Sequence, residues 1–299
     1  MPTVLAIDIG GTKIRGTTAD ASGLLGEPWR YSTERIDSAE ELVERLDYGD
    51  DDIDAIGVAA AAVVNRETNE LLNAANWAGW DLTPLGEAFG VPLAVENDAD
   101  ASALGLKRYG DVAADADLAY VTISTGIGAG ILRNGELVPG VEAGFVNVNW
   151  DGEIRHSGVN DPWEGYASGS RFPYRIREWL ADEGRETVLT GEEDAKAFFE
   201  AVYAGDRVAR EYYTRIKRIN AAGIGTLTDL FSTDTMKIGG GVALNHPNLV
   251  EYGTDPHTVE PVALNRYCMM SPPELSLNPF GVDIELYGAA AAAFECLRE

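Results

Sequence analysis

Short segments of this sequence combine residue types that could hold and transfer a phosphate group. The first is Asp8-Ile9-Gly10-Gly11-Thr12-Lys13, in which glycines follow an acidic residue at the end of an apolar run. Consecutive backbone N–H groups in such a turn bind anions. A single carboxylate suits Mg²⁺, which keeps several of its waters, so Asp8 could hold this ion directly or through water. A hairpin that merely requires glycine is the alternative for this motif alone.

A second glycine-rich segment has the sequence Thr122-Ile123-Ser124-Thr125-Gly126-Ile127-Gly128-Ala129-Gly130. It lacks the Gly-x-Gly-x-x-Gly spacing and the following helix of a dinucleotide site. The first segment likewise lacks the spacing of a Walker A loop. Both segments predict a strand, a glycine turn and a returning strand, and this repetition indicates two related lobes that face one another.

Two further segments follow predicted strands, and ligand groups bind at strand ends in α/β sheets. Glu96-Asn97-Asp98 lies between a predicted strand and a predicted helix, and an Asn followed by an Asp can orient a hydroxyl and accept its proton. The alternative is that Asn97 or Asp98 only caps the helix. Gly239-Gly240-Gly241-Val242 permits a flat ligand or a helix to approach the backbone, or else forms a C-terminal turn.

The elements that must position these segments alternate between strands and helices, which predicts an α/β fold with a partly parallel sheet. Ser38 and Glu41 form a Ser-x-x-Glu helix start. Residues 150–175 are rich in Asp, Gly, Asn, Pro and Arg and predict a functional loop, and Pro256–Pro279 predicts no regular element. We expect strands at Val4–Ile9, Lys13–Ala19, Ile53–Ala62, Val91–Glu96, Leu118–Ser124, Ala129–Arg133 and Met236–Ile238, and helices at Ser38–Leu46, Ala99–Tyr109, Ala195–Ala204, Asp206–Leu230 and Gly288–Leu297.

Composition limits the classes of protein to which the chain can belong. Its 299 residues are 45% hydrophobic and 24% charged, as in soluble globular domains, and no apolar run approaches the ~18 residues of a membrane span. No signal peptide is visible, so we expect a cytoplasmic protein. Cys268 and Cys296 are too few for a disulfide framework or a four-cysteine zinc site.

The charge balance is strongly acidic. Lys+Arg is 23 against Asp+Glu 49, a net charge of −26, which disfavours nucleic acid and anionic membranes as partners. Such a surface suits a salt-rich cytoplasm, where ions screen its self-repulsion, so we interpret it as halophilic adaptation. The alternative is simply an acidic protein.

Taken in this order and spacing, the segments resemble the ROK family of sugar kinases, within the actin/hexokinase/Hsp70-like ATPase fold, over nearly the whole chain. Asp8–Lys13 and Ser124–Gly130 resemble the family's two phosphate motifs, Asn97-Asp98 its catalytic pair, and Gly239–Val242 its adenosine motif. The remaining matches are Asn76-Trp77-Ala78-Gly79-Trp80, similar to the sugar-side segment, Trp163-Glu164-Gly165-Tyr166-Ala167-Ser168-Gly169, similar to Leu-Glu-x-Tyr-Ala-Ser-Gly, and Gly288-Ala289-Ala290, similar to the start of the terminal helix.

Two stretches depart from the family pattern. Gly144-Phe145-Val146-Asn147-Val148 replaces Gly-Glu-Ile-Gly-His, so Phe145 and Val148 stand where the family has a sugar-contacting Glu and His. Arg155-His156-Ser157-Gly158-Val159-Asn160-Asp161-Pro162 replaces Cys-x-Cys-Gly-x-x-Gly-Cys and holds no cysteine. We therefore expect no zinc site. We also expect a smaller or already phosphorylated sugar, such as a pentose or pentose phosphate, in place of glucose bound in the usual family way.

The resemblance implies an α/β fold of the two-lobed actin/hexokinase (ribonuclease H-like) type with an interlobe cleft. The N-terminal lobe would span 1–105, joined by the terminal helix 286–299, and the C-terminal lobe would span 106–285. The implied activity is transfer of the ATP γ-phosphate, with Mg²⁺, to a hydroxyl of a sugar or sugar phosphate. Asp98 would accept the hydroxyl proton, and closing of the lobes would exclude water. We also expect a homodimer.

The implied binding residues fall into two sets. ATP and its phosphates would be held by Asp8, Gly10, Gly11, Thr12, Lys13, Thr125, Gly126, Gly128, Gly240 and Gly241. The sugar would be held by Asn76, Asn97, Asp98, Arg155, His156, Glu164 and Arg171. Arg175 and Arg177 extend the arginine cluster, which could bind an anion or pair with Asp151, Glu153 and Asp161.

Three rival functions stay open. The first is a hexose kinase similar to glucokinase. The second is a sugar-responsive transcriptional repressor, since the family includes such proteins, but the first predicted strand begins at Val4 and the net charge opposes DNA. The third is a sugar-binding protein without catalysis, against which the retained Asp98 and phosphate motifs argue.

Overall fold

The computed structural model describes residues 1–33, 36, 38–46, 52–73, 77, 79–152, 155–181, 186–191 and 194–298. The chain divides into two compact units. Unit 1 comprises Met1–Ala116, Asn134–Gly140 and Val282–Glu299, and unit 2 comprises Asp117–Arg133 and Val141–Gly281. None of the helices in the described ranges is long and apolar enough to cross a membrane.

A six-stranded sheet forms the centre of unit 1, with the order β3-β2-β1-β5-β9 and β4 paired to β2. Strand β1 is antiparallel to β2 and parallel to β5, which is parallel to β9. Every residue of β1 and β5 is buried, as expected for central strands covered on both faces. The strands are β1 Val4–Ile9, β2 Lys13–Asp20, β3 Gly23–Leu24, β4 Trp29–Ser32, β5 Ala55–Ala60 and β9 Leu93–Asn97.

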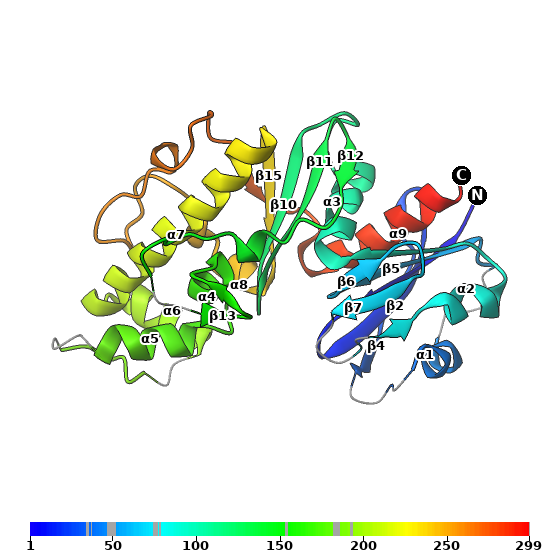
Figure 1. Cartoon of the computed structure of the whole chain (residues 1–299), viewed down its shortest axis with the longest axis horizontal. Helices are drawn as coiled ribbons and strands as arrows, with labels where there is room; N and C mark the ends of the chain where they lie inside the picture. Colours follow the sequence, from blue (N-terminus) through cyan, green and yellow to red (C-terminus); the bar gives the residue numbers. More distant parts are fainter. Residues whose placement is uncertain are drawn as a thin grey trace. The chain divides into compact units, whose positions relative to one another are not determined.

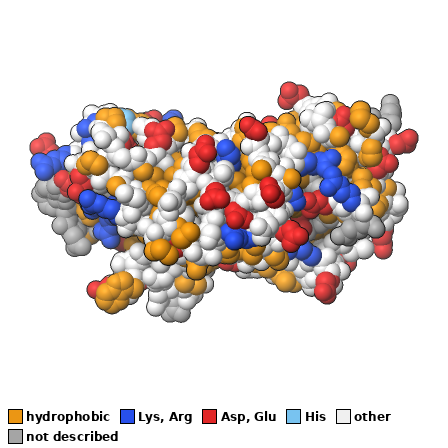
Figure 2. Space-filling view, turned by 90° about the horizontal axis from the view of Figure 1, so that it is seen from above, with side chains coloured by type: hydrophobic (Ala, Val, Ile, Leu, Met, Phe, Trp, Pro, Cys, Tyr) orange, Lys and Arg blue, Asp and Glu red, His pale blue; other side chains and the backbone are white. Residues whose placement is uncertain are grey.

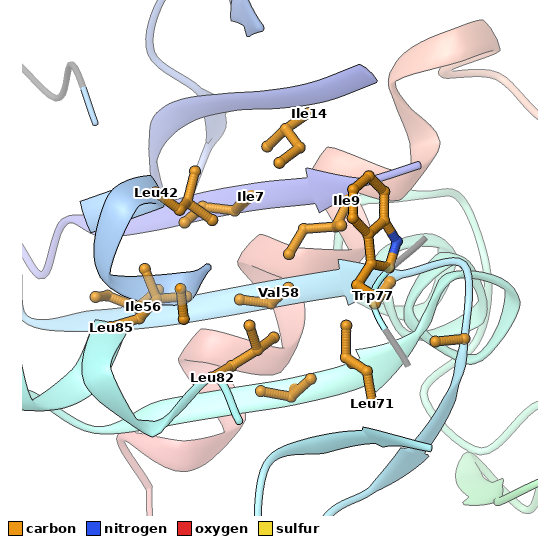
Figure 3. Packing of buried hydrophobic residues seen from close by; sticks show 14 of the residues in the cluster. Ile7, Ile9, Ile14, Leu42, Ile56, Val58, Leu71, Trp77, Leu82 and Leu85 are labelled. Atoms are coloured by element: carbon orange, nitrogen blue, oxygen red, sulfur yellow. The ribbon is translucent and has the colours of Figure 1, made fainter. Parts of the chain in front are cut away.

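The two faces of this sheet carry side chains of different size, because alternate residues of a strand point to opposite faces. Ile7 and Ile9 belong to a cluster with Leu42 of α1 (Ala39–Arg45) and Leu85 of α2 (Thr83–Phe89), shown in Figure 3. Val4 and Ala6 pack instead with alanines of α9 (Ile284–Cys296). The backbone of α9 comes so close that a Cβ on Gly57 would lie 1.9 Å from the Ala289 carbonyl oxygen. The alanine-rich terminal helix therefore provides close backbone packing.

Helix α3 (Asp98–Tyr109) packs closely against α9, as the labelled ribbons in Figure 1 show. A Cβ on Gly105 would lie 2.7 Å from the Gly288 nitrogen, so both helices need a small residue at the crossing. A three-stranded sheet of β6 (Val63–Asn65), β7 (Glu70–Asn73) and β8 (Trp80–Asp81) follows β5. The segment with β12 (Glu136–Val138) also groups with unit 1.

Unit 2 repeats the strand pattern in the order β11-β10-β15-β16. Strand β10 is antiparallel to β11 and parallel to β15, and β15 is parallel to β16. Helix α7 is 25 residues long, and Asp206 caps its N-terminus. The elements are β10 Leu118–Ile123, β11 Ile127–Arg133, β13 Arg155–His156, β14 Val159–Asn160, α4 Trp163–Ala167, α5 Phe172–Ala181, α6 Ala195–Ala204, α7 Arg207–Phe231, β15 Thr235–Gly239, α8 Gly241–Asn245 and β16 Glu274–Leu277.

Three expectations about elements were wrong. Residues 150–175 contain the β13–β14 hairpin, α4 and the start of α5 in place of one long loop. The hairpin forms because Ser157 and Gly158 both have positive φ, 50° and 85°, as the central residues of a type I′ turn require. Strand β16 lies within Pro256–Pro279, next to β15. The terminal helix begins at Ile284, four residues before the expected Gly288.

Figure 2 shows the acidic side chains on one face of the molecule. On the face shown in Figure 2 they are scattered among basic, apolar and other side chains. The net charge of −26 is therefore not gathered into a single patch on this face.

Candidate functional site

The register of the parallel strands brings two predicted segments to one edge of the unit 1 sheet. Ile9 pairs with Ala60, and Ala60 pairs with Asn97. The first glycine turn and Asn97-Asp98 therefore leave the sheet at the same edge, about 10 Å apart for two strand spacings. Trp77, from the predicted sugar-side segment, packs beside Ile9 at this end of β1 (Figure 3). Its neighbour Asn76 lies outside the described residues.

The first glycine turn is open to solvent. Gly10 N donates to Lys13 O at 3.0 Å, and Thr33 Oγ1 donates to Gly11 O at 3.3 Å, which fixes the backbone of the turn. Gly11, Thr12 and Lys13 are exposed, and a Cβ on Gly11 would meet no atom within 4 Å. The turn thus has room for an anion beside its backbone, with the Lys13 ammonium as a nearby positive charge.

Asp8 is buried behind this turn and is paired with a buried cation. Arg15 Nη2 lies 2.8 Å from Asp8 Oδ2, and Arg15 Nε donates to the same oxygen at 2.9 Å. Arg15 also contacts Asp283 at 2.9 Å and Glu285 at 3.4 Å. Burial raises the pKa of Asp8, and Arg15 opposes that shift. Both Arg15 contacts reach Oδ2 of Asp8, and Oδ1 fits the part of a single carboxylate oxygen near Mg²⁺ or its water.

Asn97 and Asp98 mark the change from β9 to α3. The Asn97 side-chain oxygen accepts hydrogen bonds from the N–H groups of Ala99 at 2.9 Å and Asp100 at 3.3 Å. The Asn97 amide nitrogen donates to Ala62 O at 3.1 Å. Asn97 is therefore the helix N-cap, as one interpretation of the sequence allowed. Asp98 is partly exposed, and its Oδ1 accepts from Ala99 N at 2.8 Å, which holds the carboxylate at the start of the helix.

A second network of charged side chains, centred on Arg66, flanks Asp98, and no sequence pattern predicted it. Arg66 Nη2 lies 2.5 Å from Glu96 Oε2 and 2.9 Å from Asp100 Oδ2. Gly140 N donates to the same Asp100 oxygen at 3.3 Å. Burial raises the pKa of Glu96, and Arg66 opposes that shift. Arg66 therefore neutralises carboxylates on both sides of Asn97-Asp98.

In unit 2, the second glycine turn and the triple glycine also leave the sheet together. Thr122 of β10 pairs with Gly239 of β15, so Ser124–Gly126 and Gly240-Gly241 lie at one edge. Gly240 has φ of 85°, and a Cβ there would lie 2.5 Å from the Ile123 carbonyl oxygen. Glycine at this position is required by close packing against the neighbouring strand. Thr125 and Gly128 lie in the turn and in the first residues of β11.

Glu164 connects this turn to the predicted sugar loop. Its Oε2 accepts from Ile127 N at 2.7 Å, and a Cβ on Gly126 would lie 2.5 Å from that oxygen. Its Oε1 lies 2.7 Å from His156 Nε2. The His156 ring stacks on Phe145 with centroids 6.3 Å apart. The structure thus brings together Glu164, His156 and one of the two residues that depart from the family pattern.

The arginines are spread more widely than the sequence suggested. Arg155 lies in β13, and its side chain falls outside the described residues. The Arg171 guanidinium lies 5.7 Å from the Tyr174 ring centroid, and Arg175 pairs with Glu178 on the same helix. Asp161, one of the partners suggested for them, accepts a hydrogen bond from Tyr166. Glu153 lies outside the described residues.

A model of the ROK family matches residues 4–274. The chain belongs to the ROK family. The glucokinase of Streptomyces coelicolor is 31% identical over 265 residues, covering 81% of this chain and 83% of its own. The Aeropyrum pernix glucokinase is 30% identical over 285 residues, covering 84% and 85%. A xylose repressor of Caldicellulosiruptor bescii is 25% identical over 218 residues, and the match covers 54% of that protein.

Solved ROK structures share the fold. The ROK hexokinase of Thermus thermophilus superposes with a TM-score of 0.78 at 26% identity, covering 99% of both chains. The ROK glucokinase of Streptomyces griseus, solved with glucose and AMPPNP, superposes with a TM-score of 0.73 at 25% identity, covering 98% of this chain and 99% of that one. The predicted two-domain actin/hexokinase-like fold is confirmed. These relatives also support the predicted class, an ATP-dependent sugar kinase.

The residues that replace the cysteine-rich ROK segment do not fit a zinc ion. His156 is the only zinc-type ligand in residues 155–162 besides carboxylate, and its Nε2 already lies 2.7 Å from Glu164. Among the described residues, no group of three or more His, Cys, Asp or Glu side chains could hold a metal ion. A structural zinc site needs four ligands, usually Cys or His.

Proposed function

We propose that this ROK protein transfers the γ-phosphate of ATP to a hydroxyl of a monosaccharide, with Asp98 as the base. The observation that carries the proposal is the strand register that places the first glycine turn and Asn97-Asp98 at one sheet edge. Asp98 is partly exposed there and fixed by the start of α3. A carboxylate in that position can accept the hydroxyl proton.

The products of the proposed step are ADP and a sugar phosphate. The sugar oxygen forms a bond to the γ-phosphorus, the bond between that phosphorus and the β–γ bridging oxygen breaks, and the hydroxyl proton moves to Asp98. The turns at Gly10–Lys13 and Thr125–Gly128 would hold phosphates through backbone N–H groups. Asp8 would hold Mg²⁺ through Oδ1 or a water, and the bound ion would supply charge neutralisation at the phosphates. Gly240 and Gly241 would border the adenosine.

The acceptor we favour is a five-carbon sugar. Phe145 and Val148 cannot hydrogen-bond, so sugar hydroxyls directed at them would be left unpaired at a cost of ~1–3 kcal/mol each. His156 stacks on Phe145 and contacts Glu164, so one polar ring lies next to Phe145. A substrate with fewer hydroxyl groups than glucose suits such a site.

A phosphorylated acceptor is less well supported by these side chains. Arg175 pairs with Glu178, and the Arg171 guanidinium lies over Tyr174. Both arginines therefore have contacts on or beside α5 that a phosphate would have to replace. Glucose is the second candidate, because relatives at 30–31% identity are named glucokinase.

A panel of sugars assayed for ATP-dependent turnover in high salt tests the substrate. The panel needs glucose, mannose, xylose, ribose and ribose 5-phosphate. We expect the highest kcat/KM with a neutral pentose. A kcat/KM for glucose above ~10⁴ M⁻¹s⁻¹, the low end of ordinary enzymes, would count against a pentose. If the enzyme also showed no preference for pentoses, glucose would be the substrate. The absence of turnover with every sugar would favour the non-catalytic sugar-binding protein.

A further inference from the structure

The stretch from Asn147 to Pro162 is closed by hydrogen bonds within unit 2. Val148 N donates to Asp161 O at 3.1 Å, and Asn147 Nδ2 donates to Asn160 O at 3.0 Å. Trp163 N donates to Val146 O at 2.9 Å, which ties the end of the stretch to its start. The β13–β14 hairpin that carries His156 projects from this closed base.

Three polar side chains are joined at the base of the hairpin. Tyr166 Oη donates to Asp161 Oδ1 at 2.5 Å and accepts from Asn149 Nδ2 at 2.9 Å. Asp161 is 2% exposed and Tyr166 4% exposed. A Cβ on Gly152 would lie 2.1 Å from Asp161 Oδ1 and 2.4 Å from Tyr166 Oη, so the chain passes directly over the group. A buried carboxylate and hydroxyl satisfied in this way hold the surrounding backbone in one arrangement.

Asp161 has an unusual backbone conformation for a residue with a side chain. Its φ is 52°, in the left-handed region that favours glycine, and it stands at the second glycine of the family's Cys-x-Cys-Gly-x-x-Gly-Cys. Asp tolerates this region better than most residues. The backbone conformation suited to glycine is therefore combined with a carboxylate that reaches Tyr166.

We propose that Asp161, Tyr166 and Asn149 form a metal-free brace that positions the β13–β14 hairpin, so that His156 stays against Glu164. Asp161 lies in the stretch Arg155–Pro162, which resembles the family's Cys-x-Cys-Gly-x-x-Gly-Cys without its cysteines, and the brace acts on sugar binding through His156 and Glu164. This role in sugar binding rests on the proposed kinase function, whereas the brace itself does not. Asp161 and Tyr166 are positioning residues, since neither is placed against a reacting atom.

Within the brace, Tyr166 supplies the hydroxyl proton that Asp161 accepts. Burial, and secondly the hydrogen bond to Asp161, raise the pKa of Tyr166 to about 12. The hydroxyl therefore remains a donor to Asp161 at neutral and mildly alkaline pH.

The first test compares Asp161→Ala with Asp161→Asn, and uses Asp151→Ala, at an exposed site, as the matched control. The Asn side-chain oxygen can still accept from Tyr166, whereas Ala removes the acceptor. We expect Asp161→Ala to raise the sugar KM about tenfold or more, the effect of one lost hydrogen bond to a charged group. The ATP KM should stay unchanged, and Asp161→Asn should restore most of the sugar affinity. A wild-type sugar KM in Asp161→Ala would overturn the proposal.

The second test does not depend on turnover. Hydrogen exchange at the Val148 and Trp163 amides should be faster in Asp161→Ala and in Tyr166→Phe than in wild type or Asp161→Asn, and unchanged by a chelator in wild type. Unchanged exchange in both variants, or faster exchange after chelation with one zinc released per chain, would overturn the brace. Tyr166→Phe keeps the ring, so it serves if Asp161→Ala fails to fold. If no sugar is phosphorylated but exchange responds as expected, the kinase proposal fails and the brace stands.

Discussion

Strands β2-β1-β5-β9 of unit 1 and β11-β10-β15-β16 of unit 2 pair in the same directions. In each set an antiparallel hairpin with a glycine turn is followed by parallel strands. Each sheet therefore brings its glycine turn and a second segment that is predicted to bind a ligand to one edge. The second segment is Asn97-Asp98 in unit 1 and Gly240-Gly241 in unit 2.

The two turns are held by different means. In unit 1 the turn lies in front of the buried Asp8–Arg15 pair, and the space beside Gly11 is open. In unit 2 the Glu164 carboxylate lies 2.5 Å from the Cβ position of Gly126 and bonds Ile127 N. A side chain at Gly126 would therefore displace the Glu164 carboxylate, whereas at Gly11 the protein leaves room for a ligand. A repeated backbone motif can keep its glycines for two different reasons.

The largest effect should follow from replacing the carboxylate of Asp98, the proposed base in unit 1. Asp98→Asn keeps the size of the side chain and removes the base, so kcat should fall by ~10²- to 10⁴-fold while ATP binding stays near normal. Steady-state kinetics and nucleotide titration measure the two effects. Asp111→Asn, an exposed change just after α3, is the control. If Asp98→Asn retains more than about half of the wild-type kcat, Asp98 is not the base.

Removing the ion pair behind the first turn should lower stability. Arg15→Met keeps the length of the side chain but leaves the buried Asp8 without its cation. Breaking a buried pair in this way costs about 3–5 kcal/mol in the free energy of unfolding. Arg30→Met, on the neighbouring strand and exposed, is the matched control. Urea unfolding followed by circular dichroism should separate the two variants, and equal midpoints would contradict the account of the first turn.

Adding a methyl group to each turn sharpens the contrast between them. Gly126→Ala should displace Glu164 from Ile127 N and raise the sugar KM by roughly 10- to 100-fold, as a lost hydrogen bond to a charged group predicts. Gly11→Ala should leave the thermal midpoint unchanged, because its Cβ meets no atom within 4 Å, and should raise the ATP KM. The two turns would not differ as described if Gly11→Ala lowered the thermal midpoint and Gly126→Ala left sugar binding unchanged.

A further effect concerns how the stability of unit 1 depends on pH. Burial, and secondly Asp8, raise the pKa of Glu285 to about 8 in the folded protein. The folded state therefore binds this proton more tightly than the unfolded chain, and the stability it contributes is fully present below about pH 4.5 and lost as pH rises to about 8. Glu285→Gln should flatten this part of the profile of thermal midpoint against pH. A profile that is the same with and without the substitution would show that Glu285 does not titrate in this range.

Most of the strands and helices could be predicted from the sequence, because burial and periodicity are local signals. Strands β1 and β5 are apolar runs covered on both faces, and Ser38 caps α1 through Glu41 N as expected. The expected loop at 150–175 was wrong because its hairpin depends on positive φ at Ser157 and Gly158, which composition does not reveal.

The side-chain networks of the candidate site were harder to predict, because they join residues distant in the sequence. Arg15 meets Asp283 and Glu285 only because α9 returns to the sheet next to β1. The one signal available was Arg15 itself, a charged residue in the buried part of β2. Arg66 carries no such signal, because it lies in the turn after β6 and its partner Glu96 lies 30 residues later, in β9.

Transfer of phosphate to a sugar hydroxyl is tested most directly by a product balance on the wild-type protein. ADP, sugar phosphate and inorganic phosphate are measured together in high salt with ATP, Mg²⁺ and the preferred sugar of the panel. We expect ADP to form only when sugar is present, and each ADP to be matched by one sugar phosphate with little inorganic phosphate. ADP matched by inorganic phosphate whether or not sugar is added, or no ADP with any sugar, would contradict transfer to a sugar hydroxyl.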